Sequence, residues 1–255
     1  MYLKDYYTIF LSRYLSVFLT LSISCVAHGA ELRGAWVQGG LLLGKTEPGT
    51  QIDFNGNAVT VSPEGDFVVA LGRDAPKIAT LTSIFEGQAT STNFVVKPRE
   101  YDIQYVEGVP QKTVTPPPEV TSRIQREAAL VAKARSVVDS RLDYLAGFVS
   151  PLEGPITGVY GSQRFYNGTP RSPHYGLDIA APNGAVVMAP APGVVRFANL
   201  DLYFSGGTLI LDHGYGVFSS FFHLSDILVD EGQIIARGDP IARVGATGRA
   251  TGPHL

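Results

Sequence analysis

The sequence Ser172-Pro-His-Tyr-Gly-Leu-Asp178 lies in the last third of the 255-residue chain. Its proline and its internal glycine disfavour a helix, so we predict a strand. Side chains alternate along a strand, which puts His174 and Asp178 on one face and Leu177 and Ile179 on the opposite, apolar face. An imidazole beside a carboxylate suits a zinc ion. On its own this spacing is weak evidence, because such pairs are common by chance.

Working outward, the other histidines gather in the same third of the chain. They are His213, His223 and His254, while His28 lies in the first thirty residues. His223 ends an apolar stretch that we predict to be a strand, and His254 follows a glycine-rich run that indicates backbone packed close to a site. Taken singly, each histidine is more often structural than functional, and for His213 we favour the structural interpretation.

The pattern of the surrounding sequence predicts a mainly β protein. The 28 glycines and 17 prolines separate short apolar runs. Asn55-Gly56 is a strong hairpin signal, since both residues accept the positive φ of a tight turn. Regularly spaced strands over residues 30–110 predict a small β-sandwich, with no cluster of residues suited to chemistry. The expected strands are 51–54, 58–61, 67–71, 78–85 and 89–96, and then 193–197, 207–211, 217–222 and 241–244.

Residues 111–147 separate the two β regions. Three prolines at 116–118 predict a stiff, extended linker, because proline fixes φ and lacks an amide proton. Apolar residues then recur every seven positions, which predicts one helix over Val120–Ala146, ended by Gly147. Such a helix could dock on a partner or cover a groove. We favour a connecting helix that packs on its own domain.

The first 29 residues have the pattern of a secretory signal peptide. Lys4 and Arg13 precede an apolar stretch over 15–26, and small residues then mark cleavage after Gly29 or Ala30. The apolar stretch is short for a membrane span, which needs about 20 residues. We therefore expect an exported protein, located in the periplasm or cell envelope.

Charge and cysteine content exclude some functions. The net charge of −3 provides no basic field for nucleic acid, so we expect no nucleic-acid partner. Cys25 is the single cysteine, and Ser22, three residues before it, disfavours a lipidation signal. After cleavage no thiol remains to act as a nucleophile or a metal ligand.

Several of these stretches, taken together, resemble the lysostaphin-type (LytM-domain) zinc endopeptidases. The order and spacing of five motifs match over about a hundred residues, which is far more specific than any one motif. The upstream β region, linker and helix also resemble modules of some members. The resemblance implies a LytM-type β domain over 148–255, truncated before its last strand. The matching stretches are 172–178, 189–195, 211–216, 223–225 and 245–255.

The resemblance also implies roles for individual residues. His174 and Asp178 fall on two zinc ligands, and His223 and His254 on residues that act in proton transfer or oxyanion stabilisation. The third ligand falls on the position after Leu255, so a chain that stops there is expected to hold zinc poorly. We interpret the chain as a fragment of a longer reading frame. Phe221 departs from the family pattern, which has a hydroxylated aromatic there.

The implied function is an exported zinc metalloendopeptidase that hydrolyses peptide cross-links between peptidoglycan stems. The main alternative is a non-catalytic LytM-domain protein that activates a cell-wall amidase and has division proteins as partners. Filled ligand positions favour the enzyme. A biotinyl or lipoyl carrier domain fails because no lysine follows Lys133. A purely structural wall-binding protein would leave the histidines and Asp178 unexplained.

Overall fold

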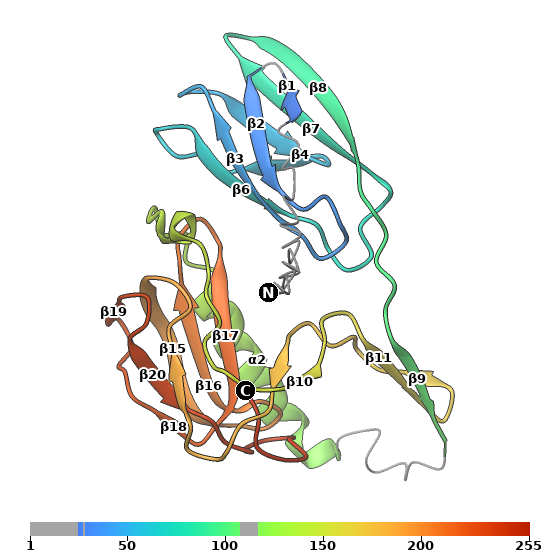
Figure 1. Ribbon diagram of the computed structural model, residues 1–255, viewed down its shortest axis with the longest axis vertical. Helices are drawn as coiled ribbons and strands as arrows, with labels where there is room; N and C mark the ends of the chain where they lie inside the picture. Colours follow the sequence, from blue (N-terminus) through green and yellow to red (C-terminus); the bar gives the residue numbers. More distant parts are fainter. Residues whose placement is uncertain (1–24, 28, 108–116) are drawn as a thin grey trace, which may run out of the picture.

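The computed structural model describes residues 25–27, 29–107 and 117–255 (Figure 1). Most of the expected signal peptide and residues 114–116 of the expected linker lie outside the described residues. Pro117 is extended as predicted for the linker, but a 3-10 turn already begins at Pro118. In the part of the chain that is described, no helix is long and apolar enough to cross a membrane. The described residues are mostly strands with a single α-helix, so the predicted mainly β fold class is confirmed.

The N-terminal region consists of two four-stranded antiparallel sheets (Figure 1). Buried residues alternate along the strands, and the buried side chains of both sheets form one hydrophobic core that includes Leu42, Phe67 and Leu81. The Phe67 ring packs directly against Gly44, and a larger residue would clash there, because a Cβ at residue 44 would lie 2.1 Å from the ring. The sheets are β1 (Cys25–Ala27), β2 (Ala30–Gly34), β3 (Leu41–Thr46) and β6 (Asp66–Ala70), and β5 (Asn57–Val59), β4 (Gln51–Phe54), β7 (Ile78–Phe85) and β8 (Gln88–Val95).

The predicted hairpin at Asn55-Gly56 is confirmed. Asn55 and Gly56 have φ values of 54° and 83°, and they connect β4 to β5. The Gly56 amide donates to Asp53 Oδ1 over 2.8 Å, which closes the turn. The sequence located this turn because its signal is local.

The chain leaves the sandwich through β9 (Ile103–Val106), which runs away from it in Figure 1. This strand pairs in parallel with β11 (Gln163–Tyr166), and β11 pairs with β12 (Thr169–Pro170). The segment that follows the sandwich is therefore hydrogen-bonded to residues of the C-terminal region, 60 positions further along the chain.

The helix is shorter than predicted. After η1 (Pro118–Val120), α2 spans Thr121–Arg135, and a second short turn, η2, spans Asp143–Ala146. Tertiary contacts override the sevenfold pattern beyond Arg135. The Asp139 carbonyl accepts from the Tyr215 amide, and the Asp139 carboxylate pairs with Arg196, so this segment is fixed to the sheet. Val138, one of the apolar residues that recur every seven positions in the predicted helix, is exposed.

The C-terminal region is built on the antiparallel sheet β17-β16-β15-β19. All seven residues of β16 are buried, because both faces of the strand are covered by other parts of the domain. Leu209 and Leu211 face the main core, while Ile210 packs with Val131 and Ala134 of α2. The helix thus packs on its own domain, as favoured. The sheet contains β15 (Gly193–Leu202), β16 (Gly206–Asp212), β17 (Phe218–Leu224) and β19 (Ile234–Ile235).

Two smaller sheets complete this region. One has the order β14-β20-β18, and the other pairs β10 with β13. The backbone at Leu255 exchanges two hydrogen bonds of 2.9 Å with Ile179, so the last residues run alongside β13. The strands are β14 (Val186–Met188), β20 (Pro240–Arg243), β18 (Asp226–Ile227), β10 (Ile156–Gly158) and β13 (Asp178–Ile179).

Candidate active site

The structure brings the four predicted site residues together. His174 Nε2 lies 3.0 Å from Asp178 Oδ1, and His254 Nε2 lies 4.0 Å from the same oxygen. The His223 and His254 rings have centroids 4.8 Å apart. Three imidazoles and one carboxylate, drawn from positions 80 residues apart in sequence, therefore form one cluster.

Each of the three imidazoles is oriented by a backbone carbonyl. The Nδ1 atoms of His174, His223 and His254 lie 3.2, 2.8 and 2.8 Å from the carbonyl oxygens of Val159, Thr247 and Gly252. A carbonyl can only accept, so each Nδ1 carries a proton. In the neutral imidazole this leaves the Nε2 lone pair free to bind a metal or accept a proton, as in metal-binding histidines.

The local structure around His174 differs from the predicted strand. The chain bends at Gly176, β13 begins only at Asp178, and Leu177 is 51% exposed instead of facing an apolar layer. His174 is held by backbone hydrogen bonds to Ser162 and Gly161, which a sequence pattern could not reveal. The bend still brings the imidazole to the carboxylate.

Gly158 is a site residue that the sequence did not single out. It pairs with Asp178 across β10 and β13. A Cβ at residue 158 would lie 2.2 Å from Asp178 Oδ2, so only glycine leaves room for the carboxylate in this position. A single glycine among 28 carries no sequence signal that would have identified it.

His223 has an unusual backbone. Its φ of 62° lies in the left-handed region, which is uncommon for residues other than glycine and often occurs at functional sites. Its amide donates to Ser205 over 2.8 Å. Gly245 allows the close approach on the other side, because a Cβ there would lie 2.5 Å from the His223 carbonyl oxygen. The close packing predicted for the glycine-rich run is thus present.

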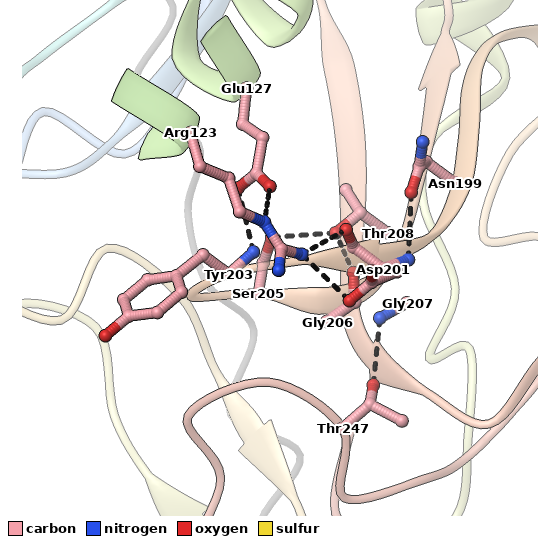
Figure 2. A network of polar contacts seen from close by, with 10 residues as sticks. All are labelled: Arg123, Glu127, Asn199, Asp201, Tyr203, Ser205, Gly206, Gly207, Thr208 and Thr247. Carbon is pink, nitrogen blue, oxygen red and sulfur yellow. Dashed lines mark hydrogen bonds and ion pairs between the residues drawn. The ribbon is translucent and has the colours of Figure 1, made fainter. Parts of the chain in front are cut away.

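Helix α2 braces the turn that contains Tyr203 and Ser205 (Figure 2), and the Ser205 carbonyl accepts from the His223 amide. Arg123 bonds Glu127 over 2.6 Å and the carboxylate of Asp201 over 2.9 Å. The second oxygen of Glu127 accepts from the Tyr203 amide over 2.8 Å. The turn after Tyr203 carries Ser205, so the polar face of α2 fixes backbone next to the site.

The same turn is joined to the loop that orients the His223 ring. The Gly207 amide donates to Thr247 Oγ1 over 2.8 Å (Figure 2), and the Thr247 carbonyl accepts from His223 Nδ1. Two adjacent backbone segments therefore hold His223, one through its amide and one through its ring.

Replacing Glu127 by alanine should destabilise the fold by about 1–3 kcal/mol, because the Tyr203 amide and Arg123 both lose a charged partner. Urea unfolding measures this change. Glu119, exposed at the start of the helical segment, is the matched control and should shift the midpoint little when replaced by alanine. Equal effects of the two variants would contradict the bracing role.

Electrostatics distinguish the histidines. The hydrogen bond to Asp178 raises the pKa of His174, and the same bond lowers the pKa of Asp178. Burial lowers the pKa of His223, which favours its neutral form. Both shifts favour the charged pair, in which a proton on His174 Nε2 is donated to Asp178 Oδ1 in a hydrogen bond. A metal cation could take the place of that proton.

The side chains of the cluster carry nitrogen and oxygen donors of the kind that bind zinc, but few of them lie close together. Within the described ranges, no group of three or more His, Cys, Asp and Glu side chains is arranged to hold a metal ion. His174 and Asp178 face each other closely, whereas His254 Nε2 stands 4.0 Å from the carboxylate. Nitrogen and oxygen donors of this kind are the ligands of catalytic zinc sites, which use three protein ligands.

His213 lies outside this cluster. It is fully buried, and its ring bridges the Pro192 carbonyl and Ser219 Oγ, with Phe148 packed against it at right angles. The structural interpretation of His213 is therefore supported. Burial lowers its pKa, so it stays neutral near neutral pH.

The buried His213 should make stability depend on pH. Below a pH of about 6.5, the histidine of the unfolded state binds a proton, whereas buried His213 in the folded state binds it less readily because its pKa is lowered. The free energy of unfolding therefore falls as the pH drops below about 6.5. The variant His213→Gln should lose this part of the dependence between pH 7.5 and 5, as measured by urea midpoints. Parallel pH profiles of the two proteins would show that His213 makes no such contribution.

The fold and the site together define a mainly β protein with three histidines and one aspartate clustered at one site. The model of peptidase family M23 matches residues 172–255. Peptidoglycan DD-endopeptidases ShyB and ShyA of Vibrio cholerae are 41% and 39% identical over 101 residues, 39% of this chain. A crystal structure from Pseudomonas aeruginosa, classed with peptidase M23, superposes with a TM-score of 0.64 at 31% identity and 86% coverage of both chains. This chain belongs to peptidase family M23.

The match to the curated relatives covers a limited part of them. It spans 24% of ShyB and 23% of ShyA. The family model matches residues 172–255, which carry the site, and the structural match to the Pseudomonas protein extends over 86% of the chain.

Proposed function

We propose that this chain carries the catalytic region of a zinc metalloendopeptidase that hydrolyses peptide cross-links of peptidoglycan. The observation that supports this function best is the cluster in which the Nε2 atoms of His174 and His254 are turned toward one carboxylate. Membership of family M23 and relatives named peptidoglycan DD-endopeptidases support peptidoglycan as the substrate class. We further propose an exported protein of the cell envelope.

In this proposal, His174 and Asp178 are two zinc ligands. The pairing of the final residues with β13 suggests where a third would lie. His254 stands opposite Ala180, and Leu255 exchanges hydrogen bonds with Ile179. In an antiparallel register, the position after Leu255 then stands opposite Asp178, with its side chain on the same face. A histidine at that position would complete the set of three.

Bound zinc would supply a water molecule whose pKa is lowered toward about 7. His223 and His254 each present an Nε2 that can accept a proton, because their Nδ1 protons are held by carbonyls. Once protonated, either ring can donate a hydrogen bond to a developing oxyanion. Burial lowers the pKa of His223 and so favours its neutral form, in which the Nε2 lone pair is available.

Release of soluble peptides from purified peptidoglycan tests this function. The chain, extended by one histidine after Leu255, should release them with zinc and stop when zinc is removed by a chelator. If no release occurs and a cell-wall amidase is activated instead, the chain is a non-catalytic activator and the proposal is wrong.

A further inference from the structure

One turn, Val159–Ser162, makes most of the contacts that hold His174. The Gly161 amide donates to the His174 carbonyl over 2.7 Å, and the His174 amide donates to Ser162 over 2.8 Å. The Val159 carbonyl accepts from His174 Nδ1 over 3.2 Å. The backbone and the ring of this proposed ligand are therefore as well ordered as the turn.

The other side of this turn is bonded to the N-terminal β-sandwich. Arg73 Nε donates to the Gly161 carbonyl over 2.8 Å, across 88 residues of sequence. The Tyr101 hydroxyl donates to the Arg73 carbonyl over 2.8 Å, and the guanidinium lies 4.3 Å above the Tyr101 ring. The Arg73 side chain is only 10% exposed, so water competes little for these contacts.

The turn also fits closely against the sandwich. Gly161 has a φ of 89°, and a Cβ there would lie 2.0 Å from the Tyr101 ring. The Tyr160 ring packs on Gly39 in the same way, since a Cβ at residue 39 would lie 2.5 Å from it. The backbone on both sides of the contact is thus shaped to receive aromatic rings.

From these contacts we propose that Arg73 is a positioning residue for His174, so that the N-terminal sandwich forms part of the site. Arg73 fixes Gly161, and the turn fixes His174 for metal binding. The inference rests on the proposed zinc function. Its physical basis is ordering: if the turn were released, His174 would have to be ordered again each time a metal bound, which weakens affinity.

Arginine suits this position better than lysine. Its planar guanidinium donates through Nε to Gly161 and through Nη1 to Asp74, and it stacks on Tyr101 at the same time. A lysine could replace one of these contacts but not all three, so Arg73→Lys should restore only part of the function.

The test uses the full chain with one histidine added after Leu255, and compares Arg73→Ala and Arg73→Lys with the parent. Zinc titration gives affinity, and hydrogen exchange of residues 159–176 reports the turn without metal. Arg33→Ala is the matched control, because Arg33 is 72% exposed and bonds Glu31 on its own strand.

In Arg73→Ala we expect zinc affinity about tenfold weaker and exchange over 159–176 faster, with β16 unchanged. Arg73→Lys should be intermediate, and Arg33→Ala should match the parent. Unchanged exchange and affinity in Arg73→Ala would overturn the inference, as would faster exchange throughout the protein. If the parent binds no zinc, the proposed function fails, while the exchange measurement still decides whether Arg73 orders the turn.

Discussion

Adding one histidine after Leu255 should raise zinc affinity by about 100-fold or more. A structural zinc site contributes roughly 10–16 kcal/mol over four ligands, so one ligand is worth about 3 kcal/mol. The register with β13 places the added side chain opposite Asp178, within reach of the His174–Asp178 pair. Zinc titration of the two chains measures the difference.

An added alanine is the matched control for this prediction, because it lengthens the backbone without a ligand. It should leave zinc affinity at the level of the unextended chain. Equal affinities of the histidine and alanine extensions would show that the position does not meet the metal, and would contradict the register argument.

Replacing His223 by alanine in the histidine-extended chain should lower peptide release by about 10²–10⁴-fold, the usual contribution of a positioned acid or base. His223 is not a proposed ligand, so zinc affinity should stay within about threefold of the parent. The left-handed backbone at His223 holds its ring beside His254, and alanine cannot replace that group. Release rates and zinc titration together separate chemistry from binding.

The replacement Phe222→Ala serves as the control for His223→Ala. Phe222 is the preceding residue of β17 and is 40% exposed, so its loss perturbs the strand without removing an imidazole. It should retain most of the activity. A His223→Ala enzyme as active as this control would remove His223 from the mechanism.

Structure that depends on neighbouring residues could be predicted from the sequence. Asn55-Gly56 located a hairpin because a tight turn needs positive φ at those two residues. Each histidine and Asp178 was weak evidence on its own, and they could be singled out only because five motifs matched a known family in order and spacing. The structure then brings these residues together.

What the sequence could not show depends on contacts between distant segments. The sevenfold pattern continued past Arg135, but pairing of Asp139 with Arg196 and Tyr215 ends the helix there. His174 is held by hydrogen bonds to the 159–162 turn, a contact between separate segments that the sequence around His174 does not reveal. Gly158 and Arg73 look ordinary in sequence, since only the fold brings them to Asp178 and Gly161.

In the proposed function, zinc held by His174 and Asp178 carries the activity. The most direct measurement is the zinc content of the purified histidine-extended chain and of its His174→Ala variant, with peptide release from peptidoglycan measured on the same samples. We predict one zinc per chain and release for the parent, and neither for the variant. A His174→Ala variant that releases wall peptides without zinc would contradict the account.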